Sequence, residues 1–138
     1  MVTVFDVQPG KLIDKAAEEL EKMGIEKPDF INYVKSGSHA ERRPEQQNFW
    51  FIRLASLLRQ AYTNPKIGVN RLRTHYGGKK NRGRKPSKHR DSSGSIIRRG
   101  LQELEKQGFI KKEKVGRVIT GKGKKFLDNI AKQVAEGQ

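Results

Sequence analysis

The segment that most constrains this chain is residues 77–94, which contain no Ala, Val, Leu, Ile, Met, Phe, Tyr or Trp. A segment of glycine, serine, asparagine, proline and cations cannot offset the entropy cost of its ordering by burying apolar surface. The sequence therefore predicts a mobile basic insertion at 77–94, unstructured in the free protein and ordered by a ligand. A solvated linker is the alternative interpretation.

Positive charge is concentrated around this insertion. Residues 71–99 hold 11 Lys and Arg residues against Asp91 alone, a net charge of +10. The first 70 residues carry 10 basic and 9 acidic residues (+1), and the rest carry 20 and 6 (+14), which together give the whole-chain charge of +15. Such self-repulsion indicates a polyanionic partner, and dense cation runs typically meet phosphate backbones.

The remaining sequence suits one small domain, 1–138. Leu, Ile, Val and Phe make up 33 of the 138 residues, above the roughly 20% below which a highly charged chain stays disordered. The longest apolar run, 49–52, is far too short to span a bilayer, and the acidic N-terminus lacks the apolar stretch of a signal peptide. We therefore expect a soluble, cytoplasmic protein without membrane contact. Because cysteine is absent and only three histidines occur, no metal or cofactor is expected.

Apolar residues at helical spacing predict four helices in the first part of the chain, over 9–23, 29–34, 48–62 (or from Gln47) and 67–76. Gly24 suits the C-cap of the first helix, and Asp29 suits the N-cap of the second. The third helix is the expected core helix, with an apolar stripe formed by Trp50, Phe51, Leu54, Ala55, Leu58 and Tyr62. On that helix, Arg53 and Arg59 are each open to three interpretations: surface charge, packing stem or RNA contact.

The second part of the chain predicts a helix, a hairpin and a last helix. Ser92 or Ser93 caps the first of these helices, which ends at Gly108 and leaves four residues outside its buried stripe: Ser95, Arg98, Arg99 and Gln102. The hairpin joins 109–113 to 117–120 around Val115-Gly116, and Thr120 caps the last helix. This order predicts a mainly α fold, a winged helix-turn-helix-like core with a short β-hairpin wing and extra N-terminal helices.

Three lysines crowd the first turn of the last helix: Lys122, Lys124 and Lys125. The helix dipole disfavours cations at that end. A bound anion is one explanation, because backbone donors and lysines would converge on it. Three solvated lysines at a small energetic cost are the other explanation.

Catalytic interpretations fail on chemistry. The segment 116–123 is close to a nucleotide-binding phosphate loop, but Gly123 stands where a magnesium-binding hydroxyl is required, and 117–119 has the character of a strand. His75 and His89 flank the insertion near Asp91, yet no nucleophile and base can be identified around them. The sequence therefore predicts no enzymatic activity.

Several separated motifs resemble one family. They are Trp50, Arg53-x-Ala55-Ser56, Tyr76-Gly77-Gly78, Pro86, Ser93 and Ile96-x-Arg98-x-Gly100-Leu101-Gln102-x-Leu104-Glu105. In this order, over about residues 3–134, they resemble the archaeal and eukaryotic small-subunit ribosomal protein nineteen, which is distinct from the bacterial protein of that number. The resemblance implies a winged-helix-like protein in the head of the small subunit that binds ribosomal RNA and takes part in subunit maturation. It places Arg53, Arg59, Arg98 and Arg99 on a basic, RNA-facing surface, and 79–90 in a variable basic loop.

We therefore expect a structural constituent of the small ribosomal subunit that is monomeric when free. Its expected partners are small-subunit ribosomal RNA and the neighbouring ribosomal proteins of the subunit head. The expected RNA-binding residues are Arg53, Arg59, Arg71, Arg73, Lys79, Lys80, Arg82, Arg84, Lys85, Lys88, Arg90, Arg98, Arg99, Lys122 and Lys124. The alternative hypothesis is a winged-helix transcription regulator that binds duplex DNA, although the long insertion ahead of the outer Arg helix does not suit a groove-reading geometry.

Overall fold

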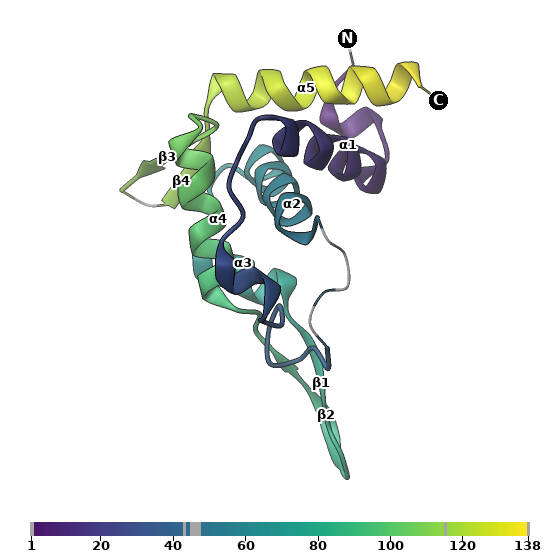
Figure 1. Cartoon of the computed structure of the whole chain (residues 1–138), viewed down its shortest axis with the longest axis vertical. Helices are drawn as coiled ribbons and strands as arrows, with labels where there is room; N and C mark the ends of the chain where they lie inside the picture. Colours follow the sequence, from purple (N-terminus) through teal and green to yellow (C-terminus); the bar gives the residue numbers. More distant parts are fainter. Residues whose placement is uncertain (1, 43, 45–47, 115, 138) are drawn as a thin grey trace.

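A computed structural model describes residues 2–42, 44, 48–114 and 116–137. Over these residues the chain is mainly α (Figure 1). The elements are η1 (Val4–Asp6), α1 (Pro9–Lys22), η2 (Asp29–Asn32), α2 (Phe49–Thr63), α3 (Val69–Tyr76), β1 (Gly78–Arg82), β2 (Lys85–Arg90), α4 (Gly94–Lys106), β3 (Ile110–Glu113), β4 (Gly116–Ile119) and α5 (Gly121–Glu136). No helix among them is long and apolar enough to cross a membrane.

The core is built around α2, the predicted core helix. Its buried side chains occupy more than one face because α1 and α4 both pack against it. Trp50 is only 1% exposed, and Leu54, Leu57 and Leu58 are fully buried. Helix α5 packs across α1 and η1 at the end of the molecule that also holds both termini (Figure 1). One hydrophobic core therefore joins the N-terminal helices to the winged-helix part.

Most predicted helix boundaries are confirmed. Asn48 stands at the N-cap of α2, and Gly24 and Gly108 follow α1 and α4 with φ values of 78° and 83°. The Thr120 hydroxyl caps α5 by accepting a hydrogen bond from the Gly123 amide at 3.2 Å. Two positions named in the predictions, Gln47 and Val115, lie outside the described residues.

The helix predicted over 29–34 is wrong. The structure has only the short 3₁₀ turn η2 there, with Pro28 rather than Asp29 at the N-cap and no side-chain cap bond. Helix nucleation is costly, and an uncapped segment of this length does not recover that cost with backbone hydrogen bonds. Phe30 and Ile31 instead pack against the core from this short 3₁₀ turn.

The wing and its attachment confirm the winged-helix architecture. Strands β3 and β4 are antiparallel: Ile110 pairs with Ile119 at one end of the ladder, and Glu113 pairs with Gly116 at the other. Ile67, just before α3, adds an antiparallel bridge to Arg117 with two backbone hydrogen bonds of 3.0 and 2.9 Å. The Arg117 guanidinium also pairs with the Glu105 carboxylate of α4. These bonds fix the wing against α3 and α4.

The basic insertion is a β-hairpin, so the prediction that it is unstructured is wrong. Strands β1 and β2 pair antiparallel through a two-residue turn, where Gly83 adopts a φ of 73°. The backbone of 36–38 supports the hairpin root: Ser93 N donates to Ser36 O at 2.7 Å, and Gly37 bridges Ser92. Paired backbone groups and this support supply order that a count of apolar residues does not reveal.

The mobility of this hairpin in the free protein stays a prediction. Every residue of β2 is exposed, and the hairpin projects away from the helices (Figure 1). We expect the amide protons of β1 and β2 to exchange with solvent much faster than those of α2, because little buried surface protects them. Bound RNA should slow that exchange. Equal protection of the hairpin and α2 in the free protein, measured by hydrogen exchange, would contradict the predicted mobility.

Candidate nucleic-acid interface

The outer face of α4 presents exposed polar side chains, as predicted. Ile97, Leu101 and Leu104 are buried on the inner side. The residues left on the outside are Ser95, Arg98, Arg99 and Gln102, all exposed. The Arg99 guanidinium lies 4.6 Å from the centre of the Phe30 ring in η2. This cation–π contact limits the directions that Arg99 can take. Arg98 is exposed as well, without a ring contact to any described residue.

Arg53 is a packed side chain rather than a free surface charge. Its guanidinium lies 4.0 Å from the ring centre of Tyr76 and 5.1 Å from that of Phe49. Burial lowers the pKa of Arg53, and the neighbouring Tyr76 opposes that shift. Arginine keeps its charge under all ordinary conditions. Arg53 therefore joins α2 to α3 while carrying a positive charge near the surface.

Tyr76 is the other half of this α2–α3 contact. Its hydroxyl forms a 2.6 Å hydrogen bond with Ser56. Burial raises the pKa of Tyr76, and the hydrogen bond to Ser56 opposes that shift. Arg59, one and a half turns beyond Arg53, is half-buried, and its Nε makes no hydrogen bond with any residue that the structure describes. Because this Nε is buried, it is not the atom with which Arg59 could contact a ligand outside the protein.

The two arginines of α3 differ in surroundings. Arg71 is exposed. Arg73 donates from Nε to the Ser92 carbonyl at 3.1 Å, and the Arg73 carbonyl accepts from Ser92 N at 2.9 Å. Arg73 thus ties α3 to the segment that leads from the hairpin into α4. Its predicted role as an RNA contact is not tested by this arrangement.

The predicted hairpin cations are close together, on an element next to α4. They are Lys79, Lys80, Arg82, Arg84, Lys85, Lys88 and Arg90. The chain passes from β2 into α4 within a few residues, so this group continues toward the exposed arginines Arg98 and Arg99. The hairpin cations and the exposed arginines of α4 therefore lie on two successive elements of the chain.

Lys122 and Lys124 lie elsewhere, at the start of α5. Lys122 Nζ donates to the Gln107 carbonyl at 2.9 Å and lies 5.3 Å from the centre of the Phe109 ring. Gln107 is the C-cap of α4, where a helix dipole favours a cation. The position of Lys122 at a helix N-terminus is therefore explained within the chain. The hairpin enters the other end of α4, about 20 Å away at 1.5 Å per residue.

The segments considered for catalysis have structural roles. Residues 116–119 of the phosphate-loop-like segment form β4, and the Thr120 hydroxyl is used as a helix cap. His75 contacts Gln60 Nε2 at 3.2 Å, and His89 contacts Asp91 at 3.3 Å. Because the two histidines pair with different residues on separate elements, they do not form one site.

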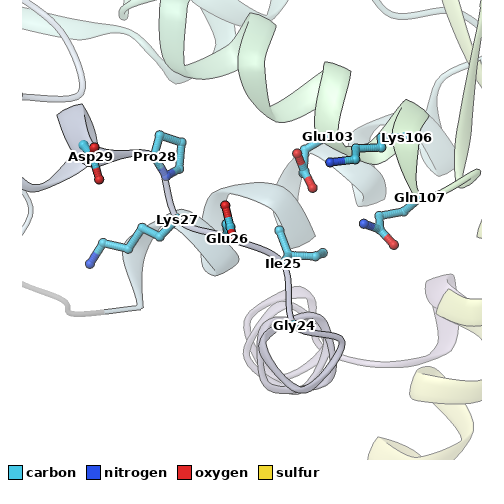
Figure 2. Close-up of a pocket in the computed structure, with 9 residues that line it drawn as sticks. All are labelled: Gly24, Ile25, Glu26, Lys27, Pro28, Asp29, Glu103, Lys106 and Gln107. Carbon is cyan, nitrogen blue, oxygen red and sulfur yellow. The ribbon is translucent and has the colours of Figure 1, made fainter.

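Sequence reasoning missed the support of the hairpin and a groove lined by both carboxylates and lysines. Lys80 Nζ donates to the Ser38 carbonyl at 3.0 Å, so residues 36–39 hold one side of the hairpin root. Figure 2 shows the groove, of about 520 Å³, between residues 24–29 and the end of α4. Its carboxylates come from Glu26, Asp29 and Glu103, and its lysines are Lys27 and Lys106. Because carboxylates and lysines both line this groove, its charge is mixed and does not by itself favour an anionic ligand.

Comparisons with known proteins identify the family. The profile described as ribosomal protein S19e matches residues 3–137. The small ribosomal subunit protein eS19 of Haloarcula marismortui is 42% identical over 95% of this chain and 90% of its own length. The eS19A proteins of Schizosaccharomyces pombe and Saccharomyces cerevisiae are 40% and 41% identical, each over 98% of this chain and at least 95% of their own lengths. These are structural ribosomal proteins rather than enzymes, and the chain belongs to the ribosomal protein S19e family.

Proposed function

We propose that this protein is a structural constituent of the small ribosomal subunit that binds its ribosomal RNA and supports its assembly. It acts in the cytoplasmic ribosome, beside neighbouring ribosomal proteins of the subunit head. Relatives named as small-subunit proteins, at about 40% identity over nearly the whole chain, support this assignment. The observation that carries the RNA-binding part is the exposed cationic surface formed by the β1–β2 hairpin and the outer face of α4.

This surface carries a large excess of positive charge, which suits a phosphate backbone. Within residues 71–99 the sequence supplies Asp91 as its single acid, and Asp91 already contacts His89 and Thr74. The eleven cations of this segment therefore lack a matching number of anions within it. Phosphate neutralisation releases counterions from RNA and gives affinity that falls steeply with salt.

The DNA-regulator hypothesis is disfavoured by the position of the hairpin. Recognition helices place their N-terminal residues against base edges in the major groove. Here two other segments flank the N-terminus of α4: Ser93 N is bonded to Ser36 O at 2.7 Å, and the hairpin projects from the same end (Figure 1). A duplex groove would have to accommodate all three segments. A surface that follows RNA backbones has no such requirement.

Sedimentation of a cell extract through a sucrose gradient at about 0.5 M salt tests the assignment. Non-specific contacts between cations and phosphates weaken by orders of magnitude at that salt concentration. We expect the protein to remain with the small subunit. Release to the top of the gradient would contradict a role as a structural constituent.

Charge reversal on α4 tests the RNA-facing surface. We expect Arg98→Glu with Arg99→Glu to lower affinity for small-subunit ribosomal RNA about 100-fold, since each lost charge-assisted contact contributes about 1.5 kcal/mol. The circular dichroism spectrum should not change, because both side chains are exposed. Filter binding at physiological salt measures the affinity.

The matched control reverses two exposed cations of α1, Lys11 and Lys22, and produces the same change in net charge. Lys11→Glu with Lys22→Glu should reduce affinity only a few-fold, through the general loss of positive charge. Equal losses in the two double variants would show that the α4 face is not a specific contact.

A further inference from the structure

The pairing of β1 with β2 contains one extra residue on β2. Lys80 pairs with Lys88, whereas Arg82 pairs with Lys85. Two steps along β1 therefore match three steps along β2, which is a β-bulge at Pro86-Ser87. Because side chains alternate between the two faces of a strand, a bulge changes which residues share a face.

The bulge gathers cations on one face of the hairpin. Residues that pair directly across two strands lie on the same face. Positions 78, 80 and 82 of β1 lie on one face because side chains alternate along a strand. Their partners on β2, which are Arg90, Lys88 and Lys85, therefore lie on the same face. The resulting five-cation face consists of Lys80, Arg82, Lys85, Lys88 and Arg90. Without the bulge, strand alternation would place Lys85 on the opposite face with His89.

The opposite face carries much less charge. Lys79 pairs with His89, and Asn81 follows Lys79 on that face of β1. His89 is engaged with Asp91 at 3.3 Å, and the Asn81 side chain accepts a hydrogen bond from Gly83 N at 2.9 Å. This face therefore has one permanent cation, Lys79, and two of its other side chains are engaged in contacts within the chain.

The five-cation face carries electrostatic repulsion in the free protein. Like charges lie directly opposite each other in the pairs Lys80–Lys88 and Arg82–Lys85. Directly opposed like charges destabilise a strand pair. Hydrogen bonds nevertheless hold two of these side chains in place: Lys80 Nζ reaches Ser38 O, and Arg82 Nε reaches the Pro86 carbonyl at 2.9 Å. A polyanion against this face would remove the repulsion that the fold creates.

We propose that the hairpin binds one continuous run of RNA backbone with its five-cation face and keeps the Lys79 face outside the RNA contact. This inference rests on the proposed RNA-binding function and adds which side of the hairpin the RNA occupies. Cations two residues apart along a strand are spaced by roughly 6–7 Å, so they form a row that a single phosphate backbone can follow. The Ser38 carbonyl accepts from Lys80 Nζ near the root, whereas Arg90 on β2 is exposed there, so the row of cations extends from Arg90 to the turn.

Two double variants with equal charge changes test the proposal. Lys85→Glu with Lys88→Gln changes the charge of the five-cation face by −3, and Lys79→Glu with Asn81→Asp makes the same change on the opposite face. The first variant also relieves the repulsion at Arg82 and Lys80, so it strengthens the hairpin and cannot act by unfolding it. In the second, the aspartate oxygen still accepts from Gly83 N.

Binding to a transcript of small-subunit ribosomal RNA is measured by filter binding between about 0.1 and 0.5 M salt. We expect the Lys85/Lys88 variant to lose at least tenfold in affinity, with a salt slope lowered by roughly 1.4–1.8 for two lost contacts. The Lys79/Asn81 variant should lose less than threefold and keep its slope.

Equal losses in the two variants would overturn the proposal, because RNA would then contact both faces. Unchanged affinity in both, with a wild-type protein that binds, would remove the hairpin from the interface but leave the proposed function intact. Failure of the wild-type protein to bind the transcript at physiological salt would overturn the proposed function, and the hairpin proposal with it.

Discussion

Trp50→Ala should lower the free energy of unfolding by about 3–5 kcal/mol, the usual cost of truncating a large buried aromatic side chain. Trp50 is 1% exposed and lies on α2, which α1 and α4 both contact. The substitution leaves a cavity that neighbouring leucines, already fully buried, cannot fill without moving whole helices. A loss of this size is a large part of the 5–15 kcal/mol that stabilises a typical domain. Urea unfolding followed by circular dichroism measures it, because the chain has no other tryptophan to report by fluorescence.

Trp50→Phe is the control for this prediction. Phenylalanine keeps most of the apolar volume, and the Trp50 Nε1 that it removes makes no hydrogen bond with any described residue. Removal of an unpaired buried donor offsets part of the lost packing, so the cost should stay below about 1.5 kcal/mol. A phenylalanine variant as unstable as the alanine variant would show that the indole N–H, rather than packing, stabilises this site.

Local patterns were sufficient to predict the helical framework. The 3.6-residue spacing of apolar residues in α2 and α4, with Gly24 and Gly108 at helix ends, depends only on neighbours along the chain. The wing was predictable for the same reason, since Gly116 separates two short segments of strand character. Helix η2 was predicted as longer than it is because a cap residue and a few apolar positions do not specify helix length.

The β1–β2 hairpin was not predictable from apolar periodicity. Its strands contain no apolar side chains, so they show no alternation of apolar and polar residues. Its root is held by backbone groups of residues 36–38, which come some 40 residues earlier in the chain. Long-range backbone pairing leaves no local signature in sequence. The bulge that selects the five-cation face is a property of strand register, and register becomes visible only in the structure.

The cationic residues of the candidate interface were predictable as a set, but their individual surroundings were not. Charge density pointed to the hairpin and to α4. Arg53 stacks on Tyr76, Arg73 bonds to the Ser92 carbonyl, and Lys122 bonds to the Gln107 carbonyl. Each of these contacts joins two elements, so it depends on tertiary packing. The sequence supplies the charges, and the fold decides which of them remain free for a ligand.

Gly123→Ala should destabilise the protein by about 2–3 kcal/mol, because α5 starts in close contact with the wing. A methyl group at Gly123 would lie 2.5 Å from the Phe109 carbonyl oxygen and 2.8 Å from Ile119 Cγ1. The carbonyl is backbone and already accepts a hydrogen bond from Thr120 N at 2.9 Å. The helix must therefore shift, which costs more than the helix propensity that alanine gains over glycine, up to about 1 kcal/mol. Thermal or urea unfolding measures the loss.

Gly121→Ala is the matched control, two residues earlier in the same helical turn. No atom lies within 4 Å of the position that its methyl group would occupy. Alanine there should raise stability by about 0.5 kcal/mol, through lower entropy of the unfolded chain. If both alanine variants were as stable as the wild type, α5 would not be held against β3 and β4 through Gly123. The two alanine substitutions are expected to change stability in opposite directions. The comparison therefore separates the effect of close packing at this junction from the effect of helix propensity.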